Sequence, residues 1–223
     1  IQFTTDTLPS DIVGFTMLNN ETQKFEFRPG AVFSNLLLAD EINRTSPKTQ
    51  AALLEAMEEH NVTVDGVTYD LPHPFITMAT QNPMGSAGTQ PLPESQLDRF
   101  MICLSIGYPN LEKQIEIIKS RRYDNPIERI KEVASKENVI EVQNYLSSVR
   151  ISDDVLKYIV LLCEKTREMP LVELGVSPRG VLALVQMAKA HAVLEDRIYV
   201  IPEDVQYVFL DVCAHRMILR PQA

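Results

Sequence analysis

Short hydrophobic runs that end at polar side chains distinguish the first half of the chain. In the stretch 35–41, five uncharged and mostly aliphatic residues lead directly into Asp40 and Glu41. An apolar run without alternation predicts a strand that is buried on both faces of a parallel sheet. Residues 75–80 form a second such run, which leads into Asn82. Because ligands of open α/β sheets bind outside the carboxyl ends of the strands, these polar residues are candidates for function.

Alternation and turn-forming residues predict the remaining strands. A third strand is expected at residues 99–106, and a short strand at residues 1–4 precedes a turn at residues 8–11. The dipeptide Asp65-Gly66 favours a type I′ turn between two strands. The patterns therefore predict two β-hairpins, formed by residues 15–18 with 24–28 and by residues 62–64 with 67–69.

Helical periodicity dominates the chain from Leu111 onward. Helices are expected at residues 111–122, 127–136 and 139–149, and three more begin at Ser152, at Ser177-Pro178 and at Pro202. In the first half, Ser46 is a good N-cap and Pro47 suits the first helical position, so a helix is expected to about Glu59, followed by a short one at 93–98. The patterns predict an α/β fold with a sheet core and hairpin inserts at residues 1–108, a helical connection at 109–148 and an all-α domain at 149–223.

Composition and charge narrow the possible classes of function. Of the 223 residues, 45% are hydrophobic and 23% are charged, which is ordinary for a globular protein. The formal net charge of -9 disfavours a nucleic-acid binder, because phosphate backbones select basic surfaces. No apolar run approaches the roughly 20 residues that span a bilayer, and no signal peptide is expected. The cysteines have no metal-ligand spacing, so we expect buried thiols in a reducing, cytoplasmic compartment at Cys103, Cys163 and Cys213.

Polar side chains on separate segments have the chemistry that phosphoryl transfer requires. Asp40 and Glu41 supply carboxylates for a magnesium ion and for an attacking water. Asn82 can orient a water or contact a phosphate, and Arg99 and Arg179 supply positive charge for phosphate oxygens. Each residue alone is a weak signal, and their order on the expected elements makes the combination specific.

Each candidate also has a structural interpretation. A cation in the first turn of a helix opposes the helix dipole, so an anionic ligand explains Arg179 better than an ordinary surface position does. The acidic run Glu55, Glu58 and Glu59 is most simply a solvated helix face. Without a ligand, Asp40 and Glu41 would be a solvated strand end, Asn82 a turn residue before Pro83, and Arg99 the partner of a salt bridge to Asp98.

The same segments resemble the MoxR family of AAA+ ATPases, from Ile1 to about Pro221. The two hairpins match the helix-2 insert and the pre-sensor-1 hairpin of the wider clade, which also contains magnesium-chelatase subunits. The resemblance implies a partial P-loop-type parallel sheet followed by an α-helical lid domain. Four stretches carry it: residues 35–44 match Walker B and the following turn, 79–83 match sensor 1, 91–100 match the arginine-finger segment and 175–180 match sensor 2.

The resemblance implies an ATPase whose cofactors are ATP and Mg²⁺. Asp40 would help to hold the Mg²⁺, Glu41 would polarise the attacking water, and Asn82 would position that water against the γ-phosphate. Arg99 would act in trans, on nucleotide held by a neighbouring subunit. Arg179 would read the nucleotide state from the lid, in cis or in trans.

The resemblance also implies partners. It suggests a homo-oligomeric ring, a hexamer, in which Arg44 is a further candidate at the subunit interface. The ring would remodel or mature a client protein complex in a chaperone-like way, together with a protein that carries a von Willebrand factor A domain. The hairpin tips at residues 19–21 and 65–66 are candidates for contact with the client. A non-hydrolysing scaffold module and a magnesium-chelatase-like subunit are also compatible with the sequence, whereas the net charge disfavours a DNA-directed motor.

One motif of the family is absent from this sequence. No Gly-x-x-x-x-Gly-Lys-Ser/Thr phosphate-binding loop occurs in the 223 residues. The resemblance places that loop and its strand before Ile1, with the strand between those that end at Asn82 and Pro109. We therefore expect the second part of an ATPase core with its lid, and negligible ATPase activity from this chain alone.

Overall fold

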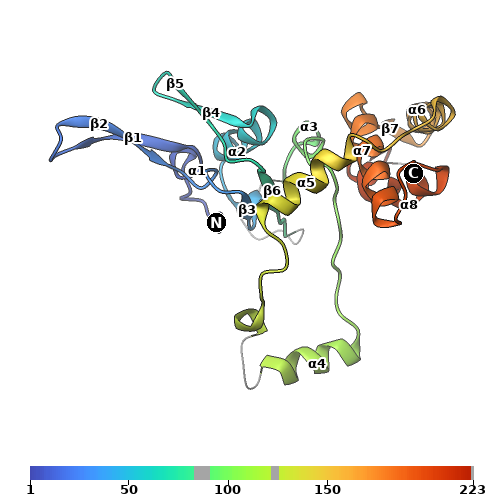
Figure 1. Cartoon of the computed structure of the whole chain (residues 1–223), viewed down its shortest axis with the longest axis horizontal. Coiled ribbons are helices and arrows are strands. Elements are labelled where there is room, and N and C mark those ends of the chain that lie inside the picture. The colour runs from blue at the N-terminus through green and yellow to red at the C-terminus, as the bar shows by residue number, and fades with distance from the viewer. Residues whose placement is uncertain (83–90, 122–125, 222–223) are drawn as a thin grey trace.

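The computed structural model describes residues 1–82, 91–121 and 126–221. An α/β core at residues 1–100 lies beside a helical domain at residues 149–221, which confirms the predicted fold class (Figure 1). The core contains α1 (Pro9–Val13), β1 (Gly14–Asn19), β2 (Lys24–Pro29), β3 (Leu36–Ala39), η1 (Ile42–Arg44), α2 (Pro47–Glu59), β4 (Asn61–Val64), β5 (Val67–Asp70), β6 (Ile76–Ala79) and α3 (Glu94–Leu97). Then follow α4 (Leu111–Arg121), η2 (Pro126–Arg129), α5 (Lys136–Leu146), α6 (Asp153–Glu168), β7 (Val172–Leu174), α7 (Pro178–Leu194), α8 (Pro202–Cys213), η3 (Ala214–Arg216) and β8 (Ile218–Leu219).

The two predicted central strands, β3 and β6, form a parallel pair. Leu36 lies opposite Ile76 and Ala39 opposite Ala79, so both strands end at the same edge. The first residues of the chain extend the sheet on the other side of β3, where the Phe3 amide donates to the Asp40 carbonyl at 2.9 Å. This register places the polar residues that follow β3 and β6 next to each other.

The prediction of a third strand at residues 99–106 is wrong. Residues 101–109 form no ladder with another strand among the described residues. The Cys103 amide donates instead to the carbonyl of Asp211 in α8, at 2.9 Å. An extended segment becomes a β-strand only when a neighbouring strand takes up its backbone groups, and hydrophobic pattern alone does not supply that neighbour.

The expectation that β3 is buried on both faces is also wrong. Leu37 and Ala39 are 4% and 0% exposed and belong to the core, together with Leu53 and Leu54 of α2. Leu36, on the opposite face of the strand, is 57% exposed. Side chains of a strand alternate between two faces, and within the described residues the elements of the core cover one face of this sheet.

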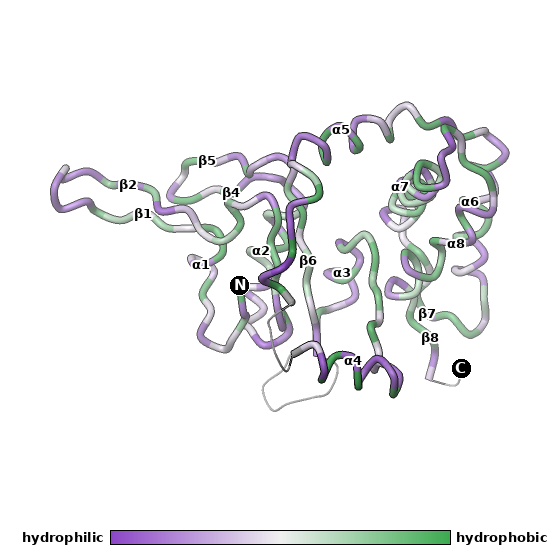
Figure 2. Tube along the Cα trace, turned by 60° about the horizontal axis from the view of Figure 1, so that its bottom comes forward, coloured by the Kyte–Doolittle hydropathy of each residue, from purple (hydrophilic) through white to green (hydrophobic). Residues whose placement is uncertain are grey.

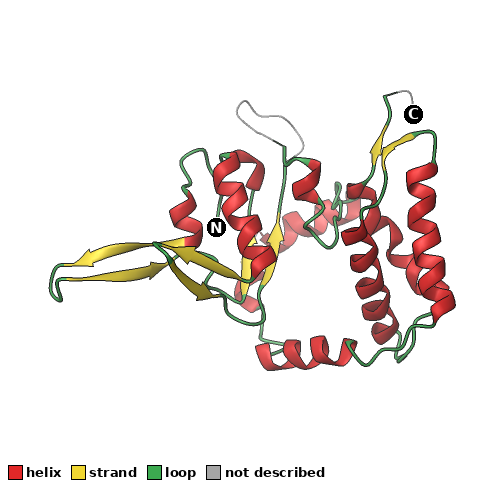
Figure 3. Ribbon diagram, turned by 90° about the horizontal axis from the view of Figure 1, so that it is seen from above, coloured by secondary structure: helices red, strands yellow, loops and turns green. Residues whose placement is uncertain are grey.

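Both predicted hairpins are confirmed. The β1–β2 hairpin extends away from the core, as Figures 1 and 3 show. In β4–β5, Asp65 has φ 49° and Gly66 has φ 79°, the two positive angles that a type I′ turn needs. The segment 8–11, expected to be a turn, instead includes the start of the short helix α1, whose Asp11 carboxylate accepts a hydrogen bond from the Leu8 amide at 2.8 Å.

The connection between the two domains differs from the prediction. The helix α4 was predicted, and Figure 2 shows both hydrophilic and hydrophobic residues along it. Its Ile118 side chain is 70% exposed. The helix expected at residues 127–136 is reduced to η2. The next helix, α5, begins at Lys136 because Ser135 and Asn138 form a reciprocal capping box immediately before it.

In the helical domain, the predicted helix starts are confirmed. Ser152 and Ser177 accept backbone hydrogen bonds as N-caps of α6 and α7. The small sheet β7–β8 was missed, so the domain is not all-α. Cys163 and Cys213 are buried free thiols as expected, but Cys103 is exposed because its segment lies at the surface. Within the described ranges, no helix is long and apolar enough to cross a membrane.

Candidate functional site

The carboxyl ends of β3 and β6 bring together the predicted residues Asp40, Glu41 and Asn82. The Thr80 hydroxyl donates to Asp40 Oδ1 at 2.5 Å and accepts from the Glu41 amide at 2.9 Å. The side chain of Asn43 donates to the Asn82 carbonyl at 3.1 Å. We call Asp40, Glu41, Asn43, Thr80 and Asn82 the strand-end cluster. Thr80 was not singled out from the sequence, because its role follows from strand register.

Glu41 adopts an unusual backbone conformation. Its φ of 54° and ψ of 47° lie in the left-handed region, which costs a non-glycine residue about 1–3 kcal/mol. The amide that follows Glu41 donates to the Thr80 carbonyl at 3.0 Å and holds this turn. The Glu41 carboxylate accepts hydrogen bonds from Gln2 and from Arg44, each at 2.8 Å. Arg44 therefore pairs within the chain, and its interface role stays a prediction.

Asp40 has the donor chemistry that magnesium prefers. Mg²⁺ is usually bound by one or two carboxylates together with water and substrate phosphates. The Asp40 carboxylate is partly exposed at the sheet edge, beside the hydroxyl of Thr80. Within the described ranges, no group of three or more His, Cys, Asp or Glu side chains could enclose a metal ion. A partly exposed carboxylate such as Asp40 fits an ion that is held mainly by water and phosphate.

Arg99 and Arg179 meet at a second place, on the carboxylate of Glu58 near the end of α2. Arg99 Nη1 contacts Glu58 Oε2, and Arg179 Nη2 contacts Glu58 Oε1. We call these three residues the arginine pair and its bridging carboxylate. The arginine pair comes from two domains, since Arg99 follows α3 and Arg179 lies in the first turn of α7.

Two structural interpretations drawn from the sequence are wrong at this place. Arg99 pairs with Glu58 and donates to the Leu54 carbonyl at 3.2 Å, whereas Asp98 binds other residues. Glu58 is a bridge between two domains and not only part of a solvated helix face. No sequence signal marks this role, because its partners lie 41 and 121 positions away along the chain.

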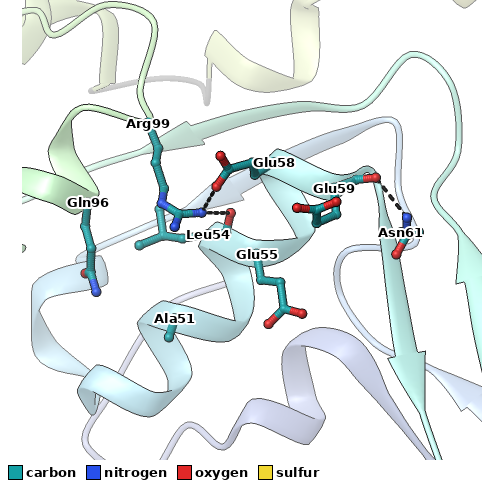
Figure 4. Close-up of a pocket in the computed structure, with 8 residues that line it drawn as sticks. All are labelled: Ala51, Leu54, Glu55, Glu58, Glu59, Asn61, Gln96 and Arg99. Atoms are coloured by element: carbon teal, nitrogen blue, oxygen red, sulfur yellow. Dashed lines mark hydrogen bonds and ion pairs between the residues drawn. The ribbon is translucent and has the colours of Figure 1, made fainter. Parts of the chain in front are cut away.

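A cavity of about 570 Å³ opens beside Arg99, between α2 and α3. Figure 4 shows the Arg99 guanidinium against Glu58, while the carboxylate of Glu55 points elsewhere. A smaller cavity of about 190 Å³ adjoins it and is lined by Met57, Glu58, Arg99 and Arg179. The Nε of Arg99 is buried and has no hydrogen-bond partner among the described residues. This region therefore offers cationic groups beside open space.

The structure thus groups the predicted site residues into two sets. Asp40, Glu41 and Asn82 share the strand-end cluster, and Arg99 and Arg179 share Glu58. Among the described residues, no hydrogen bond or ion pair joins the side chain of Asp40 or Glu41 to Arg99 or Arg179. Residue Pro83, which closes the sensor 1 match, lies outside the described residues.

Comparisons with known proteins agree with this architecture. Residues 1–102 match the model of the ATPase family associated with various cellular activities (AAA), and residues 164–223 match the AAA lid domain. The protein YeaC of Bacillus subtilis is 52% identical over 223 residues, which are all of this chain and 70% of YeaC. The chaperone MoxR1 of Mycobacterium tuberculosis is 38% identical over 228 residues, covering 98% of this chain and 60% of MoxR1. A crystal structure of a proposed ATPase from Cytophaga hutchinsonii superposes with a TM-score of 0.89 at 40% identity, covering 100% of this chain and 70% of that one.

Proposed function

The chain belongs to the MoxR family of AAA ATPases, and on this premise we propose that it hydrolyses ATP within a ring of identical subunits and remodels a client protein complex. The chain spans 70% of YeaC and 60% of MoxR1, so the proposal concerns the complete gene product. The observation that carries it is the division of the site residues into two separate sets. A site that is divided in this way within one chain can be completed between two copies of it.

The strand-end cluster would supply the hydrolytic half of the site. In the proposed mechanism Asp40 would help to hold Mg²⁺, and Glu41 would orient and polarise the attacking water. Asn82 would position that water against the γ-phosphate. The left-handed backbone of Glu41 supports this assignment, because strained backbone conformations cluster at active sites. The bound ion would neutralise the charge that develops on the phosphate oxygens.

The arginine pair would supply the second half, on nucleotide held by a neighbouring subunit. Arg99 and Arg179 bind the two oxygens of one carboxylate, an arrangement that two oxygens of a phosphate group can also satisfy. We therefore assign both arginines to the same ligand and both to action in trans. Arginine in this position stabilises the charge of the transition state.

Other parts of the proposal follow from the family. No Gly-Lys-Ser/Thr loop is present in the 223 residues, so this chain alone should turn over negligible ATP. The ring is proposed to be a hexamer that works with a von Willebrand factor A domain protein. Free, buried thiols at Cys163 and Cys213 support a reducing, cytoplasmic location.

Mixed rings of the complete gene product test this function. Glu41→Gln and Arg99→Ala should each lower kcat for ATP about 10³-fold while leaving ATP binding intact. An equal mixture of the two variants should recover about a quarter of the wild-type rate, because one interface in four joins an intact Glu41 to an intact Arg99. Glu164→Gln, which removes an exposed charge on α6, is the control and should match wild type.

Two results would contradict the proposal in different ways. A mixture that stays as inactive as its components would show that Arg99 does not act across the interface. A wild-type ring that assembles without hydrolysing ATP would favour the scaffold module.

A further inference from the structure

Asp98 connects the core to the helical domain. Its carboxylate lies immediately before Arg99 in the sequence and is 19% exposed. Asp98 Oδ1 accepts a hydrogen bond from Arg216 Nε at 2.9 Å, and the Ser177 hydroxyl lies 2.9 Å from each Asp98 oxygen. Both partners belong to the helical domain, at the start of α7 and after α8. One carboxylate therefore joins three elements.

Arg216 donates hydrogen bonds to the backbone on both sides of Arg99. Its side chain is 1% exposed, and its guanidinium donates to the carbonyls of Asp98 at 3.2 Å, Phe100 at 2.7 Å and Met101 at 3.1 Å. A guanidinium carries five N–H donors in a rigid plane, so it can hold several carbonyls in fixed relation. The carbonyls on both sides of Arg99 are thus fixed by a residue of the other domain.

Ser177 links Asp98 to the first turn of α7, which contains Arg179. Its hydroxyl caps α7 by accepting from the Gly180 amide at 3.1 Å, and it also donates to Asp98. Arg179 lies two residues after Ser177 in the same turn. A Cβ at Gly180 would lie 2.8 Å from Arg216 Cδ, so the first turn of α7 and Arg216 are in close contact. Both arginines of the pair are therefore adjacent to groups that Asp98 holds.

We propose that Asp98 is a positioning residue that, through Arg216 and Ser177, holds Arg99 and Arg179 in a fixed relative position. The helical domain and Arg99 of the core would then move as a unit toward the nucleotide of the neighbouring subunit. This inference rests on the proposed function of Arg99. It goes beyond that function because it assigns a role to a carboxylate that binds Arg216 and Ser177 and not the arginine pair. A salt bridge that serves only folding would not need to adjoin both arginines.

Asp98→Asn in the complete gene product tests the proposal. The loss of charge should displace Arg99 and lower kcat about 10- to 100-fold, because small displacements of a transition-state group have effects of that size. The KM for ATP should stay within about twofold, since the nucleotide is held mainly by the other subunit. Asp154→Asn, an exposed carboxylate in the first turn of α6, is the matched control and should leave kcat unchanged.

Mixed rings separate positioning from a purely structural role. Asp98→Asn subunits mixed equally with Glu41→Gln subunits should recover about a quarter of the wild-type rate, as Arg99→Ala subunits do, because both defects lie on the same side of the interface. Ser177→Gly should lower kcat about tenfold, the effect of one lost hydrogen bond to a charged group. Glycine is chosen because it also serves as an N-cap. This second variant decides the matter if Asp98→Asn does not fold.

The outcomes distinguish this inference from the proposed function. Unchanged kcat in either folded variant, or a defect that Glu41→Gln subunits do not complement, would overturn the positioning role. If Arg99→Ala is as active as wild type, the proposed function itself has failed, whatever Asp98→Asn does.

Discussion

Under the proposed function, Glu58 occupies the place at the arginine pair that an anionic ligand would take. Replacing it with glutamine should therefore strengthen anion binding by this 223-residue chain. The side chains of Arg99, Arg179 and Glu58 are 31%, 42% and 36% exposed. Ion pairs with such exposure contribute about 0.5 kcal/mol each, so the two contacts together cost a competing anion about 1 kcal/mol. Their removal should lower the Kd about fivefold.

Pyrophosphate is a suitable probe, because it carries phosphate oxygens without a nucleoside. Its binding to wild type, Glu58→Gln and Glu55→Gln can be compared by calorimetry at low ionic strength. Glu55 lies one turn earlier on α2 and lines the same 570 Å³ cavity, but no hydrogen bond or ion pair joins it to Arg99 or Arg179 within the described ranges. Glu55→Gln thus has the same change in net charge without the loss of a contact.

The comparison between the two variants decides the outcome. We expect tighter binding in Glu58→Gln and little change in Glu55→Gln, with the difference disappearing at high salt as screening increases. Equal gains in both variants would mean that net charge acts alone. Weaker binding in Glu58→Gln would mean that Glu58 orients the arginines for the anion and does not compete with it. Either result refutes competition at this site.

Two further predictions concern the helical domain. Burial alone would raise the pKa of Asp204, but the Arg197 guanidinium, the Ile201 amide and His191 lower this pKa to about 2, so Asp204→Asn should cost about 2 kcal/mol in urea unfolding at pH 7. Equal stability at pH 7 would contradict that prediction. Burial lowers the pKa of His215, so the unfolded chain takes up a proton more readily and stability should decrease as pH falls below about 6.5. His215→Gln should reduce this slope between pH 7 and pH 5.5, measured by Tm, and an unchanged slope would assign the acid sensitivity to other groups.

Local signals made the helix starts and the hairpin turns predictable. Ser46, Ser152 and Ser177 each cap the helix that the sequence places after them. Asp65-Gly66 has the backbone angles that its residue types favour. These features depend on contacts within a few residues, so the pattern of the sequence contains the information that determines them.

Features that depend on a distant partner were not predictable. The segment 101–109 has the composition of a strand, but its Cys103 amide binds Asp211 and no ladder forms among the described residues. Glu58 looks like any exposed helical acid until α7 and the turn after α3 are placed against it. The strand-end cluster was predictable because a local pattern marks where each of the two strands ends. Parallel strands paired in this register end at the same edge of the sheet.

The contacts of the strand-end cluster and of the arginine pair suggest how nucleotide binding could move the helical domain relative to the core. In this chain each set contacts an internal partner of opposite charge: Arg44 binds Glu41, and Glu58 binds both arginines. Under the proposed function, a phosphate group at the subunit interface would replace Glu58 as the partner of both arginines. Because Asp98 joins the arginine pair to the helical domain, that exchange would move the domain and not only two side chains. The energy of phosphate binding would then appear as motion of the lid, which is the output that a remodelling ATPase requires.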